Sequence, residues 1–120
     1  MMPEDGIKIL SDGDSILLGA VGFPGVEDHV SLWGLLLPIR QEFDQYVNLR
    51  PVKLLPGFKC PLANKNAGDI DFVVVRENTE GLYSGIEHYV GENAAETIKI
   101  ITREATENIS RYAFEYAVKH

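Results

Sequence analysis

The chain has 120 residues, enough for one small domain, and its 45% hydrophobic and 24% charged residues are ordinary for a globular protein. The formal net charge of −7 excludes attraction of nucleic acid or an anionic membrane by the bulk field, so local arginines must hold any bound anion. The single cysteine, Cys60, excludes an internal disulfide. With no apolar run of spanning length and no secretory signal at the start, we expect a cytoplasmic protein.

The first third of the chain predicts a strand, a loop and a helix. The apolar run "SILLGAV", residues 15–21, predicts a buried strand, and the Gly- and Pro-rich residues after it predict a loop. Ser31 is a candidate cap for a helix that runs to about Tyr46. Pro38 lies inside this helix, where its ring clashes with the carbonyl of Gly34, so we expect a kink or a helix that begins near Leu37. The apolar stripe of this helix comprises Leu32, Leu36, Ile39, Phe43 and Tyr46.

The remainder predicts further strands and one long helix. Residues 47–55 predict an edge strand because Pro51 cannot donate to a ladder, and residues 69–77 predict a strand covered on both faces. Residues 82–93 predict a projecting hairpin or arm, and residues 97–102 a last strand. Thr102 is the expected cap of a helix over residues 103–119. The buried stripe expected for this helix comprises Ala105, Ile109, Tyr112, Ala113 and Tyr116.

The mixture of helices and strands indicates the α/β class. About four strands and two long helices do not cover each other fully. We therefore expect that a partner completes the fold or that the chain is part of a longer protein.

Three arginines and a tyrosine are candidates for a binding site. Arg50 and Arg76 are embedded in strand patterns, which indicates that they point into a cleft or an interior. If Arg40 converged with them, the planar guanidinium groups would form a strong site for a di- or tricarboxylate. Tyr83 could then act as an acid or in a proton relay. The alternative for each arginine is a solvated or salt-bridged side chain.

Metal and nucleotide signals are weak. His29 and His88 are expected at the surface, and no cluster of His, Cys or carboxylate residues has metal-ligand spacing. The stretch "GAVGFPG" is glycine-rich, but it is neither a dinucleotide-binding fingerprint nor a P-loop.

Four stretches are spread along nearly the whole chain: "ILLGAVG", "FDQYVNLRP", "GDIDFVVVRENTEG" and "IKIITREATENISRYAFEYA". Together they resemble the β-decarboxylating dehydrogenases, the isocitrate/isopropylmalate dehydrogenase family, which also includes the tartrate/D-malate enzymes. The combination of "NLRP" and "RENTEG" is the most specific. The resemblance implies part of an isopropylmalate dehydrogenase-like fold, a mixed sheet with flanking helices. Residues 1–46 would belong to the first, cofactor-side domain, and residues 47–120 to the second, substrate and dimerisation domain.

The resemblance also implies a reaction and roles for the candidate residues. Such enzymes oxidise a 2-hydroxy acid with NAD or NADP and then release CO2, with Mg2+ or Mn2+ on the α-hydroxycarboxylate. Arg40, Arg50 and Arg76 would bind substrate carboxylates, and Tyr83 would be the catalytic tyrosine that protonates the enol. The loop with Gly22, Phe23 and Trp33 would lie along the cofactor.

The branch within the family stays open. "DHVSLWGLLLPIR" is similar to the tartrate/D-malate branch. Gly34 and Leu36 disfavour isocitrate, since that branch usually has serine and asparagine here, and Trp33 replaces the glutamate usual for isopropylmalate. "YSGIEHYV" and the C-terminal helix are closer to NAD-dependent isocitrate dehydrogenases.

The family's catalytic lysine and metal-binding aspartates lie beyond "FEYA", where this chain ends. We therefore expect no metal ligand in this chain and an incomplete site that is inactive alone. A second hypothesis is a non-catalytic carboxylate-binding or subunit-like protein. A third is an assembly role, because the arm and the last helix help to form the homodimer in this family.

Overall fold

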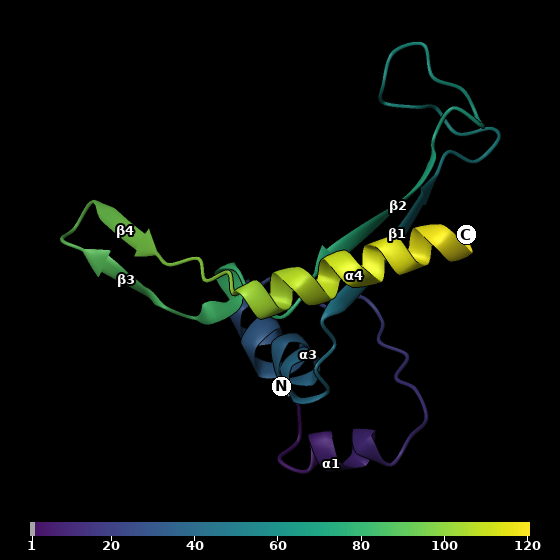
Figure 1. Ribbon diagram of the computed structural model, residues 1–120. Coiled ribbons are helices and arrows are strands. Elements are labelled where there is room, and N and C mark those ends of the chain that lie inside the picture. Colours follow the sequence, from purple (N-terminus) through teal and green to yellow (C-terminus); the bar gives the residue numbers. More distant parts are fainter. Residues whose placement is uncertain (1) are drawn as a thin grey trace. The chain divides into compact units, whose positions relative to one another are not determined.

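A computed structural model describes residues 2–120 (Figure 1). It divides into two compact units, Met1–Gln45 and Tyr46–His120. The predicted mixture of helices and strands is confirmed. Within the described residues, the strands form two separate antiparallel pairs.

The first unit is helical. Its elements are α1 (Gly6–Ser11), α2 (Asp28–Ser31), the π-helical turn η1 (Leu32–Leu36) and α3 (Leu37–Glu42). The core lies on α3, where Leu37 and Ile39 are only 2% and 4% exposed. The predicted apolar stripe is at least partly buried, although it omitted Leu37. The sequence analysis also missed α1.

The irregularity expected near Pro38 is present as the π-helical turn. Because Pro38 has no N–H, the helix cannot form its usual bond to the carbonyl of Gly34. Instead, the Leu37 N–H donates to the carbonyl of Leu32, five residues earlier, and α3 follows with Pro38 in its first turn. This helix ends at Glu42, earlier than the predicted Tyr46, because the chain turns at Asp44, which has φ of 43°.

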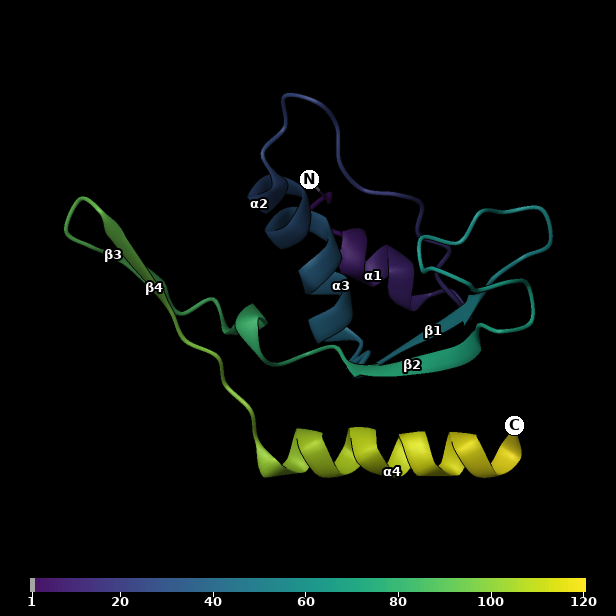
Figure 2. The ribbon, with the colours of Figure 1, turned by 90° about the horizontal axis from the view of Figure 1, so that it is seen from above.

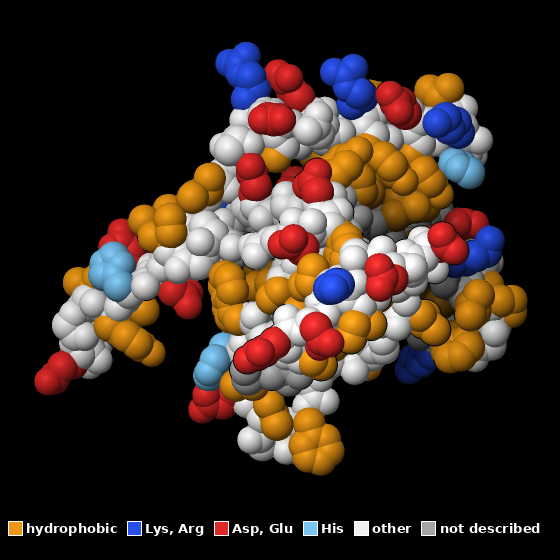
Figure 3. Space-filling model, turned by 90° about the horizontal axis from the view of Figure 1, so that it is seen from below, with side chains coloured by type: hydrophobic (Ala, Val, Ile, Leu, Met, Phe, Trp, Pro, Cys, Tyr) orange, Lys and Arg blue, Asp and Glu red, His pale blue; other side chains and the backbone are white. Residues whose placement is uncertain are grey.

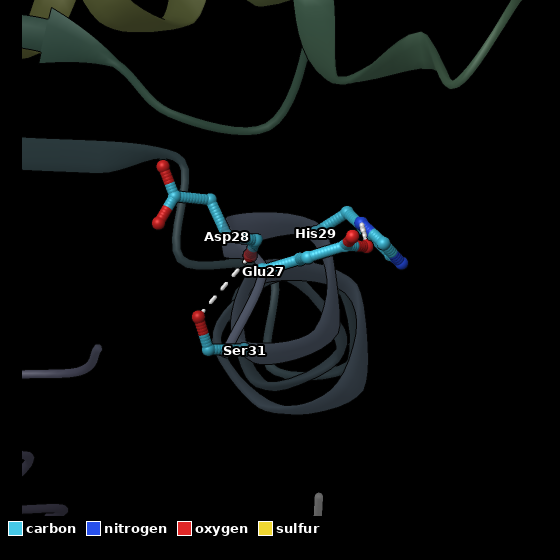
Figure 4. Close-up of polar contacts among 4 residues, drawn as sticks. All are labelled: Glu27, Asp28, His29 and Ser31. Carbon is cyan, nitrogen blue, oxygen red and sulfur yellow. Dashed lines mark hydrogen bonds and ion pairs between the residues drawn. The ribbon is translucent and has the colours of Figure 1, made fainter. Parts of the chain in front are cut away.

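The predicted cap of the first helix is wrong. Ser31 lies three residues inside the helical run, and its hydroxyl donates to the carbonyl of Asp28 at 3.1 Å (Figure 4). The residue that precedes the helix is Glu27, with extended backbone, and its carboxylate pairs with exposed His29 at 3.2 Å. The hydroxyl therefore bonds within the helix instead of satisfying its first N–H groups.

The buried strand predicted for residues 15–21 is also wrong. This segment is irregular, and Leu17 is fully exposed. Its backbone pairs with no strand among the described residues, and a strand needs a hydrogen-bonded neighbour as well as an apolar sequence.

The second unit is built on an antiparallel ribbon of β1 (Val47–Lys53) and β2 (Asp71–Glu77). Both predicted strands are confirmed, and Pro51 lies on an edge strand as expected, opposite Val73. The expectation that β2 is covered on both faces is wrong. Phe72 and Val74 are 52% and 42% exposed, whereas Val73 and Val75, which point to the other face, are partly buried.

The arm expected over residues 82–93 is present as a hairpin of β3 (Glu87–Val90) and β4 (Ala94–Thr97), so its second strand lies beyond the predicted bounds. The hairpin extends away from the ribbon in both ribbon views (Figures 1 and 2). The last strand predicted at residues 97–102 is wrong. Residues 98–102 form no strand, and only Ile100 makes an isolated bridge, to Gly81.

The final helix, α4 (Arg103–Lys119), has the predicted bounds. The hydroxyl of Thr102 caps it by accepting from the Ala105 N–H at 3.1 Å. α4 runs along β2 (Figure 2). All five residues of the predicted stripe are partly buried, whereas the rest of the helix is exposed.

Candidate functional site

Arg76 and Tyr83, two of the predicted site residues, are in direct contact. Arg76 ends the apolar run of β2, and Tyr83 lies in the short helical turn η2 (Leu82–Ser84). An Nη atom of Arg76 donates to the Tyr83 hydroxyl at 2.6 Å, and the Arg76 Cζ lies 5.5 Å from the centre of the ring. Because a guanidinium has only donors, the phenol oxygen accepts here and directs its own proton elsewhere.

Hydrogen bonds to the Glu77 carboxylate stabilise a turn in the chain between Arg76 and Tyr83. Glu77 accepts hydrogen bonds from the Thr79 N–H at 2.8 Å, the Thr79 hydroxyl at 2.6 Å and the Glu80 N–H at 2.9 Å. Burial alone raises the pKa of Glu77, but the hydrogen bonds from Thr79, Glu80 and Asn78 together leave it below its usual value. The charge of Glu77 therefore closes a tight turn that returns Tyr83 to the end of β2.

Arg50 shares a face of the ribbon with Arg76. Asn48 is directly opposite Arg76, and Arg50 is two residues further along the same strand, so all three project on one side. Asn48 links this face to the interior. Its side-chain oxygen accepts from the Arg50 Nε at 2.9 Å, and its amide donates at 3.3 Å to Asn78, which is 4% exposed.

Arg40 belongs to the first unit. It lies on α3, is partly buried, and its carbonyl accepts from the Gln45 N–H at 2.9 Å where the helix ends. The structure thus brings Arg76 and Tyr83 into contact, places Arg50 on the same ribbon face as Arg76, and places Arg40 on a helix of the other unit.

The three cofactor candidates also lie in the first unit. Gly22 has φ of 131°, a conformation that favours glycine, and a side chain there would meet nothing within 4 Å. Phe23 and Trp33 expose 73% and 42% of their surface. This segment therefore presents flat apolar surface and an open stretch of backbone.

A depression of about 440 Å3 adjoins Arg76 and Tyr83 in the second unit. Besides Arg76, its charged lining residues are Lys99, Glu77 and Glu80. The depression therefore carries charges of both signs, unlike a cluster of arginines alone. The start of α4 contributes Ala105 and Thr106 to the wall. Neither Lys99 nor Glu80 was predicted from the sequence. The available signal for Glu80 was its place in "RENTEG", the motif that begins with Arg76.

Residues 2–120 contain neither a metal-binding cluster nor a membrane-spanning helix. No group of three His, Cys, Asp or Glu side chains is placed to hold a metal ion. In the same residues, no helix is both long and apolar enough to cross a membrane.

Comparison with known proteins gives matches along the full chain. Residues 1–120 match the sequence profile described as "Isocitrate/isopropylmalate dehydrogenase". Over 98% of its length the chain is 56% identical to D-malate dehydrogenase [decarboxylating] of Escherichia coli (strain K12), of which it covers 34%. Over 99% of its length it is 53% identical to tartrate dehydrogenase/decarboxylase of Pseudomonas putida, again covering 34%.

A solved structure agrees. Isocitrate dehydrogenase from Methylococcus capsulatus superposes with a TM-score of 0.78 at 33% identity, over 98% of this chain and 34% of that chain. The chain therefore spans about a third of the length of the relatives it matches.

Proposed function

Because the chain belongs to the isocitrate/isopropylmalate dehydrogenase family, we propose that it forms part of the substrate site of an oxidative decarboxylase. The reaction would oxidise and decarboxylate a 2-hydroxy dicarboxylate, with tartrate or D-malate preferred because those relatives share half or more of the residues. The observation that carries the proposal is the 2.6 Å contact between Arg76 and Tyr83 at the edge of a depression.

The arginines bind and orient the substrate in this proposal. A guanidinium matches a carboxylate through two parallel hydrogen bonds. Arg50 is exposed and its Nε donates to Asn48, which leaves its two terminal nitrogens to form such a pair. Arg76 holds the phenol oxygen of Tyr83 and offers its remaining donors to the substrate. Arg40 provides a further guanidinium from the first unit. Fixing the acid in one pose lowers the entropic part of the barrier.

Tyr83 is the proton donor of the proposal. After CO2 leaves, the enol carbon must gain a proton, and the phenol O–H supplies it while the Arg76 guanidinium stabilises the charge that develops on the oxygen. In this proposal Tyr83 donates the proton and Arg76 stabilises the resulting charge.

The described residues suit a nicotinamide cofactor better than a metal ion. The exposed Phe23 and Trp33 and the open backbone at Gly22 fit a nicotinamide cofactor, NAD or NADP, which would accept the hydride. We therefore propose that residues 1–46 form the cofactor side and residues 47–120 the substrate side. The described residues do not fit Mg2+ or Mn2+, since they hold no group of three ligands, and no step here depends on the metal.

A chimaera tests the proposal. The 120 residues would replace the matching segment of the Escherichia coli D-malate dehydrogenase, which is 56% identical. We expect NADH formation with D-malate or tartrate, exceeding that with isocitrate and isopropylmalate. Tyr83→Phe should lower kcat by about 100-fold, and Lys53→Ala, which removes only an exposed pair with Asp71, should lower neither kcat nor KM. A chimaera that turns over none of the four acids, although folded, would refute the proposed activity.

The isolated chain separates this function from a subunit-like role. We expect no NADH formation by the chain alone, and clear turnover would show that its site is complete. Calorimetry with dicarboxylic acids supplies the second test. Micromolar binding that is lost in Arg76→Ala, without any cofactor binding, would favour the non-catalytic carboxylate-binding protein.

We further propose a homodimer that forms in the cytoplasm through the arm and α4. Tyr89 and Val90 on the hairpin expose 85% and 52% of their surface, which suits burial against a second copy. A strict monomer in sedimentation at high concentration would contradict the homodimer.

A further inference from the structure

Residues 98–102 form hydrogen bonds with the chain both before and after Tyr83. Before the tyrosine, Gly81 and Ile100 exchange two backbone hydrogen bonds, at 2.9 and 3.2 Å. After it, the Ser84 hydroxyl donates to the carbonyl of Ile98 at 2.7 Å. The turn η2 is therefore held to a neighbouring stretch of chain rather than only to its own residues.

Glu80 extends this connection to the start of α4. One oxygen of its carboxylate accepts from the Thr102 N–H at 2.8 Å, and the other accepts from the Thr102 hydroxyl at 2.7 Å. The same hydroxyl accepts from the Ala105 N–H. A hydroxyl has one proton and two lone pairs, so Thr102 can bind Glu80 and cap the helix at once. The negative charge also lies at the end of α4 where the helix dipole favours an anion.

Both residues of the candidate site are thus connected to α4. Tyr83 is three residues from Glu80, and Arg76 lies on β2, which α4 contacts. A change in where α4 begins would move the phenol relative to the guanidinium. Since they meet at 2.6 Å, a displacement of about 1 Å would break their hydrogen bond.

We propose that Glu80 and Thr102 are positioning residues, which hold the Tyr83 hydroxyl against Arg76 by joining its turn to the first turn of α4. Tyr83 donates the proton only under the function proposed above, but the positioning itself is independent of that function. The alternative is that Glu80 only stabilises the helix end.

Nuclear magnetic resonance of the full 120-residue chain tests the positioning. The 13Cζ signal of Tyr83, assigned with Tyr83→Phe, reports the hydrogen bond at the phenol oxygen, and Arg76→Ala gives its value when the contact is broken. Glu80→Ala is the decisive variant because it leaves the Thr102–Ala105 cap in place. Thr102→Val removes the hydroxyl and Thr102→Ser retains it. Ser110→Ala is the matched control, since Ser110 is exposed on α4 and does not line the depression.

We expect Glu80→Ala and Thr102→Val to move the signal at least halfway to its position in Arg76→Ala. Thr102→Ser and Ser110→Ala should leave it at the position of the unaltered chain. A Tyr83 signal that does not move in Glu80→Ala would overturn the proposal. So would loss of α4 helicity in Glu80→Ala, measured by circular dichroism, because Glu80 would then be a helix cap.

The chimaera adds a kinetic measurement. Glu80→Ala should lower kcat about tenfold, because a misplaced acid slows the proton step, while KM changes less than about twofold with the arginines intact. A rise in KM with unchanged kcat would overturn the positioning role. Failure of the unaltered chimaera to turn over would refute the proposed function alone, and the resonance experiment would still decide the positioning.

Discussion

At the residue scale, hydrogen bonds between polar side chains hold the candidate site residues in place. Asn48 receives the Arg50 Nε and donates to the buried Asn78, so an exposed arginine is anchored to the interior through one amide. Glu77 holds the turn that leads to Tyr83 by accepting hydrogen bonds from the N–H groups of Thr79 and Glu80. Of the charged residues that follow the valines of β2, Glu77 therefore stabilises the turn and Arg76 belongs to the candidate site.

The first prediction concerns Asn48. In the chimaera, Asn48→Ala should raise KM for the dicarboxylate about fivefold with kcat within about twofold, because Arg50 loses the acceptor that orients it. Asn78 loses one of its partners, which should lower the free energy of unfolding by about 1–2 kcal/mol. Steady-state kinetics and urea titration measure the two effects. Val52→Ala, on the same strand face, is the control, and an equal rise in its KM would contradict the assignment.

The second prediction concerns Glu77 and pH. Its pKa is lowered by folding, so its contribution to stability is present above the unfolded value of 4.5 and is lost as pH falls through the lower folded value. Urea titration should show stability falling below about pH 4.5, and Glu77→Gln should make that fall shallower. At pH 7 this variant should be less stable by about 1 kcal/mol, a small cost because the group is partly solvated. Glu107→Gln, at an exposed position on α4, is the control. If the dependence of stability on pH is unchanged in Glu77→Gln, the prediction is contradicted.

Backbone geometry decides the course of the chain at the scale of elements. Pro38 forces a π-helical turn, and the turn η2 is bracketed by Gly81 and Gly85, with φ of 79° and 69°. Gly81 also exchanges the two backbone bonds with Ile100. These features hold Tyr83 near the end of β2 in a turn of only three residues.

The third prediction is that Gly81→Ala strains this turn. A Cβ there would meet only the end of the Lys99 side chain at 3.8 Å, so the cost comes from the positive φ and not from a clash. We expect a loss of about 1–2 kcal/mol in the free energy of unfolding, measured by urea titration. Gly19→Ala is the control, because Gly19 has no such φ and nothing within 4 Å, and it should change stability by less than about 0.5 kcal/mol. Equal effects of the two substitutions would rule out strain at Gly81.

Much hydrophobic surface remains exposed at the scale of the whole molecule. Within residues 2–120 the fully buried apolar side chains are Leu37 and Ile39, both on α3. Figure 3 shows hydrophobic side chains spread over the visible face among acidic ones. This surface agrees with the chain's coverage of about a third of its relatives.

The fourth prediction tests how much the small core contributes. Leu37→Ala should lower the free energy of unfolding of the first unit by about 2–4 kcal/mol, because it removes the most buried side chain. The single tryptophan, Trp33, lies in the same unit and reports this unfolding by fluorescence. Val118→Ala on α4, where the side chain is 88% exposed, should change the free energy of unfolding by less than about 0.5 kcal/mol. An unchanged Trp33 transition in Leu37→Ala would show that this core is not what holds the unit together.

The sequence by itself determined the family, the strands at residues 47–53 and 71–77, the arm, and α4 with its cap at Thr102. These are local features, because caps, apolar periodicity and turn residues act over a few neighbours. Only the tertiary structure decided that residues 15–21 form no strand, that Phe72 and Val74 are exposed, and that Arg76 meets Tyr83. Strand pairing, burial and side-chain contacts depend on residues distant along the chain, and periodicity carries no information about which of them will be neighbours.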